Sequence, residues 1–319
     1  MPPEKLMIDA DPGVTDAIAI ALALVDPSLD VIAVTACGGI TSGEQAFRNL
    51  QTVISMIDPA RWPRLGWCAA PPASIQDHPD RSGLLPRDGA RGLADCEVIE
   101  ALPHAPTDSP KLLCELVREY PGEITLLTLG PLTNLQLAIE RHPDFLQDLK
   151  QIVCLGGSVV AGGNVTAAAE FNVFADPEAA RNVLTSPATK TLVPLDASSQ
   201  FVLTFDQYDA LDVDEFSRLG QFLSKTMPYA LRESRKLLGL EGIPMPELVA
   251  LASITCPRLF ERESMHLDIE VSGELTRGAT VFDRRGRENR QPNIDVLTQV
   301  DTVGVRDYLT RLVRATDVE

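Results

Sequence analysis

The chain has little positive charge for its size. Lys and Arg number 28 against 45 Asp and Glu in 319 residues, which leaves a formal net charge of -17 at pH 7. A nucleic-acid backbone and an anionic membrane surface would both be repelled by such a protein, so we expect neither as a partner. A small molecule, a cation or another protein remains as the class of ligand.

The sequence also lacks the patterns of several common sites and targeting segments. Its six cysteines include no CxxC pair, which argues against a zinc knuckle and a dense disulfide framework. The N-terminal MPPEKLMID has neither the basic start nor the apolar block of a signal peptide, and the longest fully apolar run, residues 17–25, is too short to cross a bilayer. We therefore expect a soluble cytoplasmic protein.

Short β-rich runs alternate with helical periodicity along the whole chain. KLMIDAD (5–11) precedes TDAIAIALALV (15–25), and EITLLTLG (123–130) precedes PLTNLQLAIER (131–141). This alternation predicts an α/β fold with an open, mostly parallel, Rossmann-like sheet flanked by helices, and with ligands at the carboxyl ends of the strands. Because no internal repeat or linker divides the chain, we expect a single domain over residues 1–319.

Loops and late elements complete this prediction. Residues 68–94, rich in Pro, Asp and Gly, and residues 156–169, rich in Gly and small residues, are expected to be loops at the carboxyl edge of the sheet. The last third predicts a long helical region over 214–238, a helix near 247–255, and a strand in MHLDIEVSG (265–273).

Three carboxylates crowd the first strand-to-helix junction, in the stretch DADPGVTD. Asp9 and Asp11 stand two apart at a strand end, so their side chains start on the same face, and Asp16 falls in the first turn of the next helix. Because no Lys or Arg lies between Lys5 and Arg48, these carboxylates raise one another's pKa unless a cation intervenes. Ca²⁺ and Mg²⁺ take such oxygen ligands, so the stretch predicts a divalent-cation site.

Two enzyme classes fit a DxD pair at a strand end. A haloacid-dehalogenase-type phosphatase would use Asp9 as nucleophile and Asp11 as acid and base, but the Pro-Gly that follows fits that pattern poorly. A metal-assisted hydrolase would use the carboxylates to hold the ion and deprotonate its water. In the plainest alternative Asp16 only caps the helix, and the other two carboxylates are solvated. A phosphate-binding loop is disfavoured, since no GxGxxG or GxxxxGK[ST] motif is present.

DADPGVTDAIAI is similar to the DxDPGxDDAxAI signature that opens the inosine-uridine-preferring nucleoside hydrolases. The resemblance to this family continues in LLTLGPLTNLQLAI, in CLGGSVVAGGNVTAAAEFNVFADPEAA, in TLVPLD and in GELTRGATVFDRRGR, and so spans nearly the whole chain. It implies a Ca²⁺-dependent hydrolase that cleaves the N-glycosidic bond of a nucleoside or nucleoside-like small molecule. Since dimers and tetramers are common in the family, it also implies a homodimer or homotetramer.

Carried over position by position, the resemblance implies individual roles. The implied metal ligands are Asp11, Asp16, Leu129 through its backbone carbonyl, and Glu247. The implied sugar-binding residues are Asn164, Glu170 and Asn172. Asp11 would also be the general base on the attacking water, and Asp9 would orient the metal ligands from behind.

Four substrate-side positions depart from the family pattern. Thr15 replaces the first Asp of the family's DD pair, which removes a carboxylate expected to hold the ribose 2-hydroxyl. Gly39 replaces the Asn of an AGN turn, and Asp88 stands where a His is common. Pro246-Glu247 replaces His-Asp: Glu247 can still coordinate Ca²⁺, but a proline cannot donate a proton.

None of the four histidines falls at an expected catalytic position. Protonation of the leaving base would then need Asp88 or a tyrosine such as Tyr229, or a base that departs without a proton donor. Two interpretations stay open: an active N-glycosyl hydrolase with shifted specificity, such as for a sugar whose 2-hydroxyl is absent or altered, and an impaired nucleoside- or sugar-binding relative that keeps the metal site. The retained carboxylates and sugar-binding residues favour the active enzyme.

Overall fold

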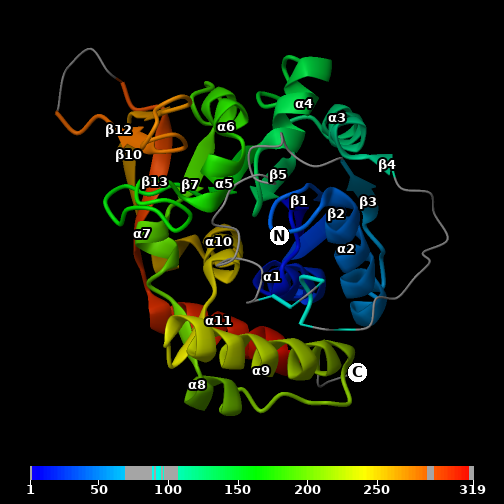
Figure 1. Cartoon of the computed structure of the whole chain (residues 1–319). Helices are drawn as coiled ribbons and strands as arrows, with labels where there is room; N and C mark the ends of the chain where they lie inside the picture. The colour runs from blue at the N-terminus through cyan, green and yellow to red at the C-terminus, as the bar shows by residue number, and fades with distance from the viewer. Residues whose placement is uncertain are drawn as a thin grey trace.

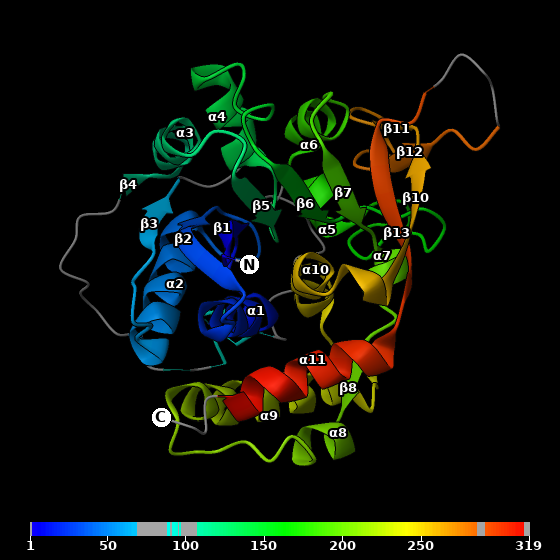
Figure 2. The same cartoon turned by 180° about the vertical axis from the view of Figure 1, so that it is seen from behind.

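The computed structural model describes residues 2–68, 88–89, 91–94, 96, 107–285 and 291–315. A twisted nine-stranded sheet runs through the molecule with helices on both faces (Figures 1 and 2). In sheet order its strands are β10 (Phe260–Met265), β13 (Ile294–Val300), β7 (Lys190–Val193), β6 (Gln151–Leu155), β5 (Ile124–Thr128), β1 (Glu4–Ala10), β2 (Leu29–Ala36), β3 (Arg64–Trp67) and β4 (Thr107–Asp108).

All neighbouring strands in this sheet pair in parallel except β10, which pairs antiparallel with β13. The predicted α/β class with an open, mostly parallel sheet is therefore confirmed. Two small antiparallel pairs lie outside it, β11 (Leu267–Ile269) with β12 (Thr280–Phe282) and β8 (Val202–Thr204) with β9 (Gly242–Pro244).

Helices pack on the two faces of the sheet around two hydrophobic clusters. One face carries α1 (Val14–Val25), α2 (Gly43–Ile57), α9 (Arg218–Leu238), α10 (Pro246–Thr255) and α11 (Thr302–Ala315). The other carries α3 (Ser109–Glu119), α4 (Thr133–Arg141) and α6 (Pro177–Leu184). The short elements α5 (Phe171–Ala175), α7 (Leu195–Ser198), α8 (Phe205–Asp209) and the 3₁₀ turn η3 (Pro257–Leu259) connect them.

The central strand β1 shows why its sequence is so apolar. Leu6 and Ile8 belong to one hydrophobic cluster and Met7 to the other, because successive side chains of a strand point to opposite faces. A strand with both faces covered has a nearly continuous apolar run. Helix α1, which follows β1, is buried from Val14 to Ala23, which explains why it is apolar on all sides.

Most predicted elements are found close to their expected bounds. The helix predicted in TDAIAIALALV (15–25) is α1, and residues 156–169 form a loop as expected. The long helix predicted from residue 214 begins at Arg218, because the Ser217 side chain accepts a hydrogen bond from the Gly220 amide and caps it. The strand predicted over 265–273 is shorter, since β11 ends at Ile269. Most of the predicted 68–94 loop lies outside the described residues.

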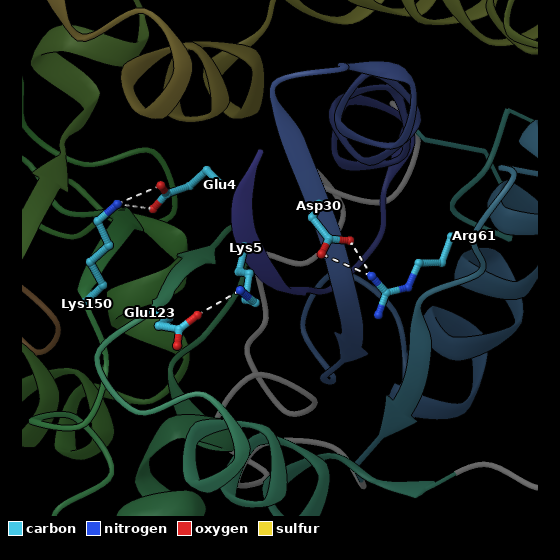
Figure 3. Close-up of polar contacts among 6 residues, drawn as sticks. All are labelled: Glu4, Lys5, Asp30, Arg61, Glu123 and Lys150. Carbon is cyan, nitrogen blue, oxygen red and sulfur yellow. Dashed lines mark hydrogen bonds and ion pairs between the residues drawn. The ribbon is translucent and has the colours of Figure 1, made fainter. Parts of the chain in front are cut away.

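The strand order brings distant segments to one edge. Strands β1, β5, β6 and β7 are neighbours, and their carboxyl ends lead to Asp11, Leu129, Gly156 and Leu195. The opposite, amino edge carries exposed ion pairs: Lys5 with Glu123, Lys150 with Glu4 and Arg61 with Asp30 (Figure 3). Within the described residues, no helix is long and apolar enough to span a membrane.

Helix α11 is tied to the end of α1 by one buried hydrogen bond. The Tyr308 hydroxyl donates to Asp26 at 2.8 Å, and Asp26 also accepts from the amide and hydroxyl of Ser28.

We expect Tyr308→Phe to lower the free energy of unfolding by about 1.5–3 kcal/mol, because it removes a hydrogen bond to a buried charged group. Urea denaturation measures this. Tyr208→Phe, at a half-buried tyrosine of α8, is the control and should stay within about 0.5 kcal/mol; equal losses in both variants would contradict the assignment.

Candidate active site

A cavity of about 310 Å³ opens at the carboxyl edge of the sheet. All seven residues that the sequence resemblance implied as metal ligands or sugar-binding residues line it: Asp11, Asp16, Leu129, Asn164, Glu170, Asn172 and Glu247. They come from the ends of β1 and β5, from the 156–169 loop and the start of α5, and from the starts of α1 and α10. The fold therefore gathers residues that are up to 236 positions apart in the sequence (Asp11 and Glu247).

Asp11 is held between two glycines that follow different strands. Its side chain is 2 % exposed, and its Oδ2 accepts a hydrogen bond of 2.8 Å from the Ile40 amide. A Cβ atom at position 39 would lie 1.9 Å from Oδ2 of Asp11, and one at position 130 would lie 2.5 Å from Oδ1. Any larger residue at Gly39 or Gly130 would displace this carboxylate. Both glycines therefore lie directly against the Asp11 carboxylate. The sequence analysis singled out Gly39 but missed Gly130.

The start of α1 holds two more buried carboxylates. Asp16 accepts a hydrogen bond from the Gly13 amide through Oδ2, while its buried Oδ1 has no hydrogen-bond partner among the described residues. Asp88 accepts from the Val14 amide at 2.8 Å, which satisfies a free donor of the first helical turn. Asp16 thus caps the helix, as the plainest interpretation expected, and also lines the cavity.

Asp9 lies near the carboxyl end of β1 and is fully buried. In the sheet register Asp9 is paired with Thr35 on β2 and with Thr128 on β5. Its Oδ1 accepts hydrogen bonds from the Thr35 hydroxyl and, at 2.7 Å, from the Asn134 side chain at the start of α4. Asp9 is not among the residues that line the cavity, so it is not placed as the nucleophile that a phosphatase would need.

The three implied sugar-binding residues also organise the local backbone. Asn172 donates through Nδ2 to the Leu129 and Leu155 carbonyls, at 2.7 and 3.1 Å. Glu170 accepts from the Val173 amide and so caps α5, and Asn164 accepts from the Phe171 amide. Glu170 and Asn172 are 6 % and 7 % exposed. These contacts orient side chains that face a cavity.

Burial dominates the electrostatics of the site. It raises the pKa of Asp9 to about 7 and that of Asp11 to about 8, and it raises the pKa of Asp16 well above its usual range. Repulsion from Glu247 adds to the increase at Asp11 and Asp16. Lys5 cannot offset this, because it stands at the other end of the seven-residue strand β1, roughly 20 Å away at 3.3 Å per residue.

The donors at the cavity are all oxygens. Among the described residues, no three Asp, Glu, His or Cys side chains form a ready-made metal-binding cluster. A bound cation would instead take carboxylate oxygens of Asp11, Asp16 and Glu247 together with the Leu129 carbonyl and water. Such a mixed set suits Ca²⁺. The buried Asp16 Oδ1, which has no hydrogen-bond partner within the described part of the chain, fits a ligand role.

The remaining predicted substrate-side positions do not line the cavity. Thr15, Gly39, Asp88 and Tyr229 are not among its lining residues; the first three are buried, and Tyr229 packs partly buried against the core. The sequence analysis missed Thr35 and Asn134, the partners of Asp9, although a polar residue opening α4 was a possible signal. It also missed several lining residues, namely Ser198, Ser199, Leu237, Leu238 and Pro244.

Comparison with known proteins gives a consistent result. Residues 6–307 match the family model described as inosine-uridine preferring nucleoside hydrolase. Uridine nucleosidase 1 of Arabidopsis thaliana is 33 % identical over 96 % of this chain and 92 % of its own length. The non-specific ribonucleoside hydrolase RihC of Escherichia coli is 31 % identical over 96 % of this chain and 97 % of its own.

Solved structures agree with this match. The plant nucleoside hydrolase PpNRh1 superposes with a TM-score of 0.85 at 28 % identity and covers 98 % of this chain and 100 % of its own. An inosine-guanosine nucleoside hydrolase superposes with a TM-score of 0.86 at 27 % identity, over 98 % of both chains. The family match spans nearly the whole sequence, and the cavity gathers the residues that the resemblance implied. This chain therefore belongs to the inosine-uridine preferring nucleoside hydrolases, a family of N-glycosyl hydrolases.

Proposed function

We propose that this protein hydrolyses the N-glycosidic bond of a nucleoside or nucleoside-like compound in a Ca²⁺-dependent reaction, with Asp11 as the general base. The observation that carries the proposal is that one cavity brings Asp11, Asp16 and Glu247 together with Glu170 and Asn172. Carboxylates and amides that line one cavity suit a sugar on which positive charge develops. The names of the relatives, which describe hydrolysis of ribonucleosides and uridine, support the same reaction class.

Each group has a defined task in this proposal. Asp11 takes a proton from the attacking water, and its contact with the Ile40 amide keeps it oriented toward the cavity. Glu170 and Asn172 hydrogen-bond the sugar hydroxyls as the ring flattens. The buried carboxylates stabilise the oxocarbenium-like charge of the transition state. When bound, Ca²⁺ would lower the pKa of the water and hold sugar oxygens.

The substrate-side changes support a shifted specificity. In the family pattern a carboxylate at the position of Thr15 is expected to hold the ribose 2-hydroxyl, and Thr15 provides none. At Gly39 there is no side chain, and the Asp11 carboxylate occupies the space beside it. We propose that the enzyme favours a sugar whose 2-hydroxyl is absent or altered. A catalytically impaired nucleoside-binding relative that keeps the metal site is the second candidate.

The cellular setting is proposed from the family and the composition. A nucleoside hydrolase of this kind would act in purine and pyrimidine salvage, in the cytoplasm, as a homodimer or homotetramer. The net charge of -17 favours an uncharged or cationic small substrate over a nucleic acid.

Replacing the general base tests the reaction. We expect Asp11→Asn to lower kcat by at least about 100-fold, since a positioned general base typically contributes 10²–10⁴-fold. Free base and reducing sugar are measured over a broad nucleoside panel with Ca²⁺ present. Asp30→Asn, on the amino edge in an exposed ion pair with Arg61, is the matched control and should keep wild-type turnover.

The alternatives predict different products in this assay. Thermal shifts with nucleosides but no product in the wild type would support the binding relative. Phosphate release from phosphoesters would favour the haloacid-dehalogenase-type phosphatase over the N-glycosyl hydrolase.

Metal removal tests the cation site. We expect Ca²⁺ at 100 times its Kd to stabilise the fold by about 2.7 kcal/mol relative to protein in chelator, because the ion binds only the native arrangement of oxygens. Asp16→Asn should abolish most of this gain and Asp30→Asn should leave it intact. Thermal unfolding with Ca²⁺ and with chelator gives both values, and an unchanged wild-type Tm would contradict a calcium site.

Paired sugars test the specificity. We expect 2-deoxyribonucleosides to be turned over faster than the matching ribonucleosides, because Thr15 provides no carboxylate for the 2-hydroxyl. The measurement is kcat/KM for each pair with the same base. Equal values, or faster turnover of the ribonucleosides, would show that this proposal is wrong.

A further inference from the structure

The loop after β6 begins with a turn that one carboxylate holds. Asp196, which follows β7 in the short helix α7, accepts four hydrogen bonds from this turn. Its Oδ2 accepts from the Val159 amide at 2.6 Å and from the Ser158 hydroxyl at 3.3 Å. Its Oδ1 accepts from the Val160 and Ala161 amides at 2.8 and 3.0 Å. Three consecutive amides and a hydroxyl thus converge on a residue that lies 35 to 38 positions later in the chain.

Residues 158–161, which we call the clamped turn, are held mainly through polar contacts. They belong to no helix or strand, and Val160 is 73 % exposed, so apolar packing contributes little at that residue. Thr280 of β12 adds a contact at Ser158, where its hydroxyl accepts from the amide at 2.9 Å and donates to the carbonyl. Hydrogen bonds to a charged acceptor are roughly twice as strong as neutral ones. Asp196, which binds all four residues of the turn, therefore contributes most to its conformation.

The clamped turn is joined to Glu170 through a single residue. Gly157 directly precedes the turn, and its amide donates to Oε2 of Glu170 at 2.9 Å. The Gly157 carbonyl accepts at 2.9 Å from the amide of Leu195, the residue before Asp196. The Val173 amide, at 3.2 Å, is the second donor to the same Glu170 oxygen. A movement of the turn would carry Gly157 with it, and the Glu170 carboxylate would then lose one of these two amides.

We propose that Asp196 is a positioning residue for sugar binding: it holds the clamped turn and, through Gly157, sets the position of the Glu170 carboxylate in the cavity. This inference rests on the proposed function and adds a residue to the sugar side of the same site. Asp196 is not among the residues that line the cavity, whereas Glu170 is. Asp196 therefore acts through Glu170 and not on the substrate itself.

The metal side of the cavity is held by other contacts. Asp11 accepts from the Ile40 amide, and Asp16 accepts from the Gly13 amide. Neither donor belongs to the clamped turn. We therefore expect loss of the Asp196 carboxylate to weaken the contribution of the sugar side and to leave the proposed Ca²⁺ site intact.

The variant Asp196→Asn removes acceptors with little change in the size of the side chain. One carboxylate oxygen becomes an NH2 group, which can only donate, so two of the four donors of the turn lose their acceptor in either orientation of the amide. The matched control is Asp26→Asn. Asp26 also accepts from several donors, namely the Tyr308 hydroxyl and the amide and hydroxyl of Ser28, but it lies at the other end of α1 from the cavity.

The experiment measures kcat/KM over the nucleoside panel with Asp196→Asn made in the wild type and in Glu170→Gln. In the wild type we expect it to lower kcat/KM about tenfold, since a small displacement of a binding group has a large effect on rate. The Ca²⁺-dependent rise in Tm should be retained. In Glu170→Gln the same change should cost less than about twofold, because the carboxylate through which Asp196 acts is gone. Asp26→Asn should lower Tm but keep kcat/KM within about twofold of the wild type, because distant sites act independently.

Equal losses in the two backgrounds, an unchanged kcat/KM in Asp196→Asn, or loss of its Ca²⁺ effect would overturn the proposal. If the wild type hydrolyses no nucleoside, the proposed function fails, and amide hydrogen exchange tests Asp196 instead. Asp196→Asn should speed exchange at Gly157 and Val173, the two amides that hold Glu170, and Asp26→Asn should not. Faster exchange confined to residues 158–161 would show that the clamped turn does not position Glu170.

Discussion

The burial of Asp11 between two glycines is the constraint on which the site depends. In its present position the carboxylate occupies space that a Cβ atom at Gly39 or Gly130, after β2 and β5, would need. Packing in the interior is dense enough that one added carbon atom cannot be absorbed there. The position of this one carboxylate therefore depends on the strand order, which brings the segments after β2 and β5 beside it, and on glycine at these two positions.

Charge is divided between the two edges of the sheet. The amino edge carries exposed ion pairs, in which Lys5, Lys150 and Arg61 each find a carboxylate (Figure 3). Such exposed pairs contribute little to stability. The carboxyl edge concentrates buried carboxylates whose pKa values burial raises. Ionising these buried carboxylates costs free energy, which is common at functional sites. A positively charged ligand or transition state would offset that cost.

The departures from the family pattern have physical consequences that differ from one another. A Cβ atom at Gly39 would lie 1.9 Å from the Asp11 Oδ2 atom, so the Asn of the family pattern would fit here only if the Asp11 side chain shifted. Asp88 serves the first turn of α1 through the Val14 amide. Pro246 lines the cavity and offers it no hydrogen-bonding group. The retained residues line the cavity, whereas Thr15, Gly39 and Asp88 do not. The reaction class is therefore better supported than the substrate.

The sequence by itself determined the elements and the main catalytic candidates. Alternating apolar runs predict the parallel sheet, and DADPGVTD with its family signature locates Asp11 and Asp16, because both signals are local in the chain. That the chain forms one domain over its whole length stays a prediction. Only the tertiary structure decided that Asn134 supports Asp9 and that Asp11 and Glu247 line the same cavity. These arrangements join segments separated by more than one hundred residues, and they depend on strand order and helix packing, which no local pattern encodes.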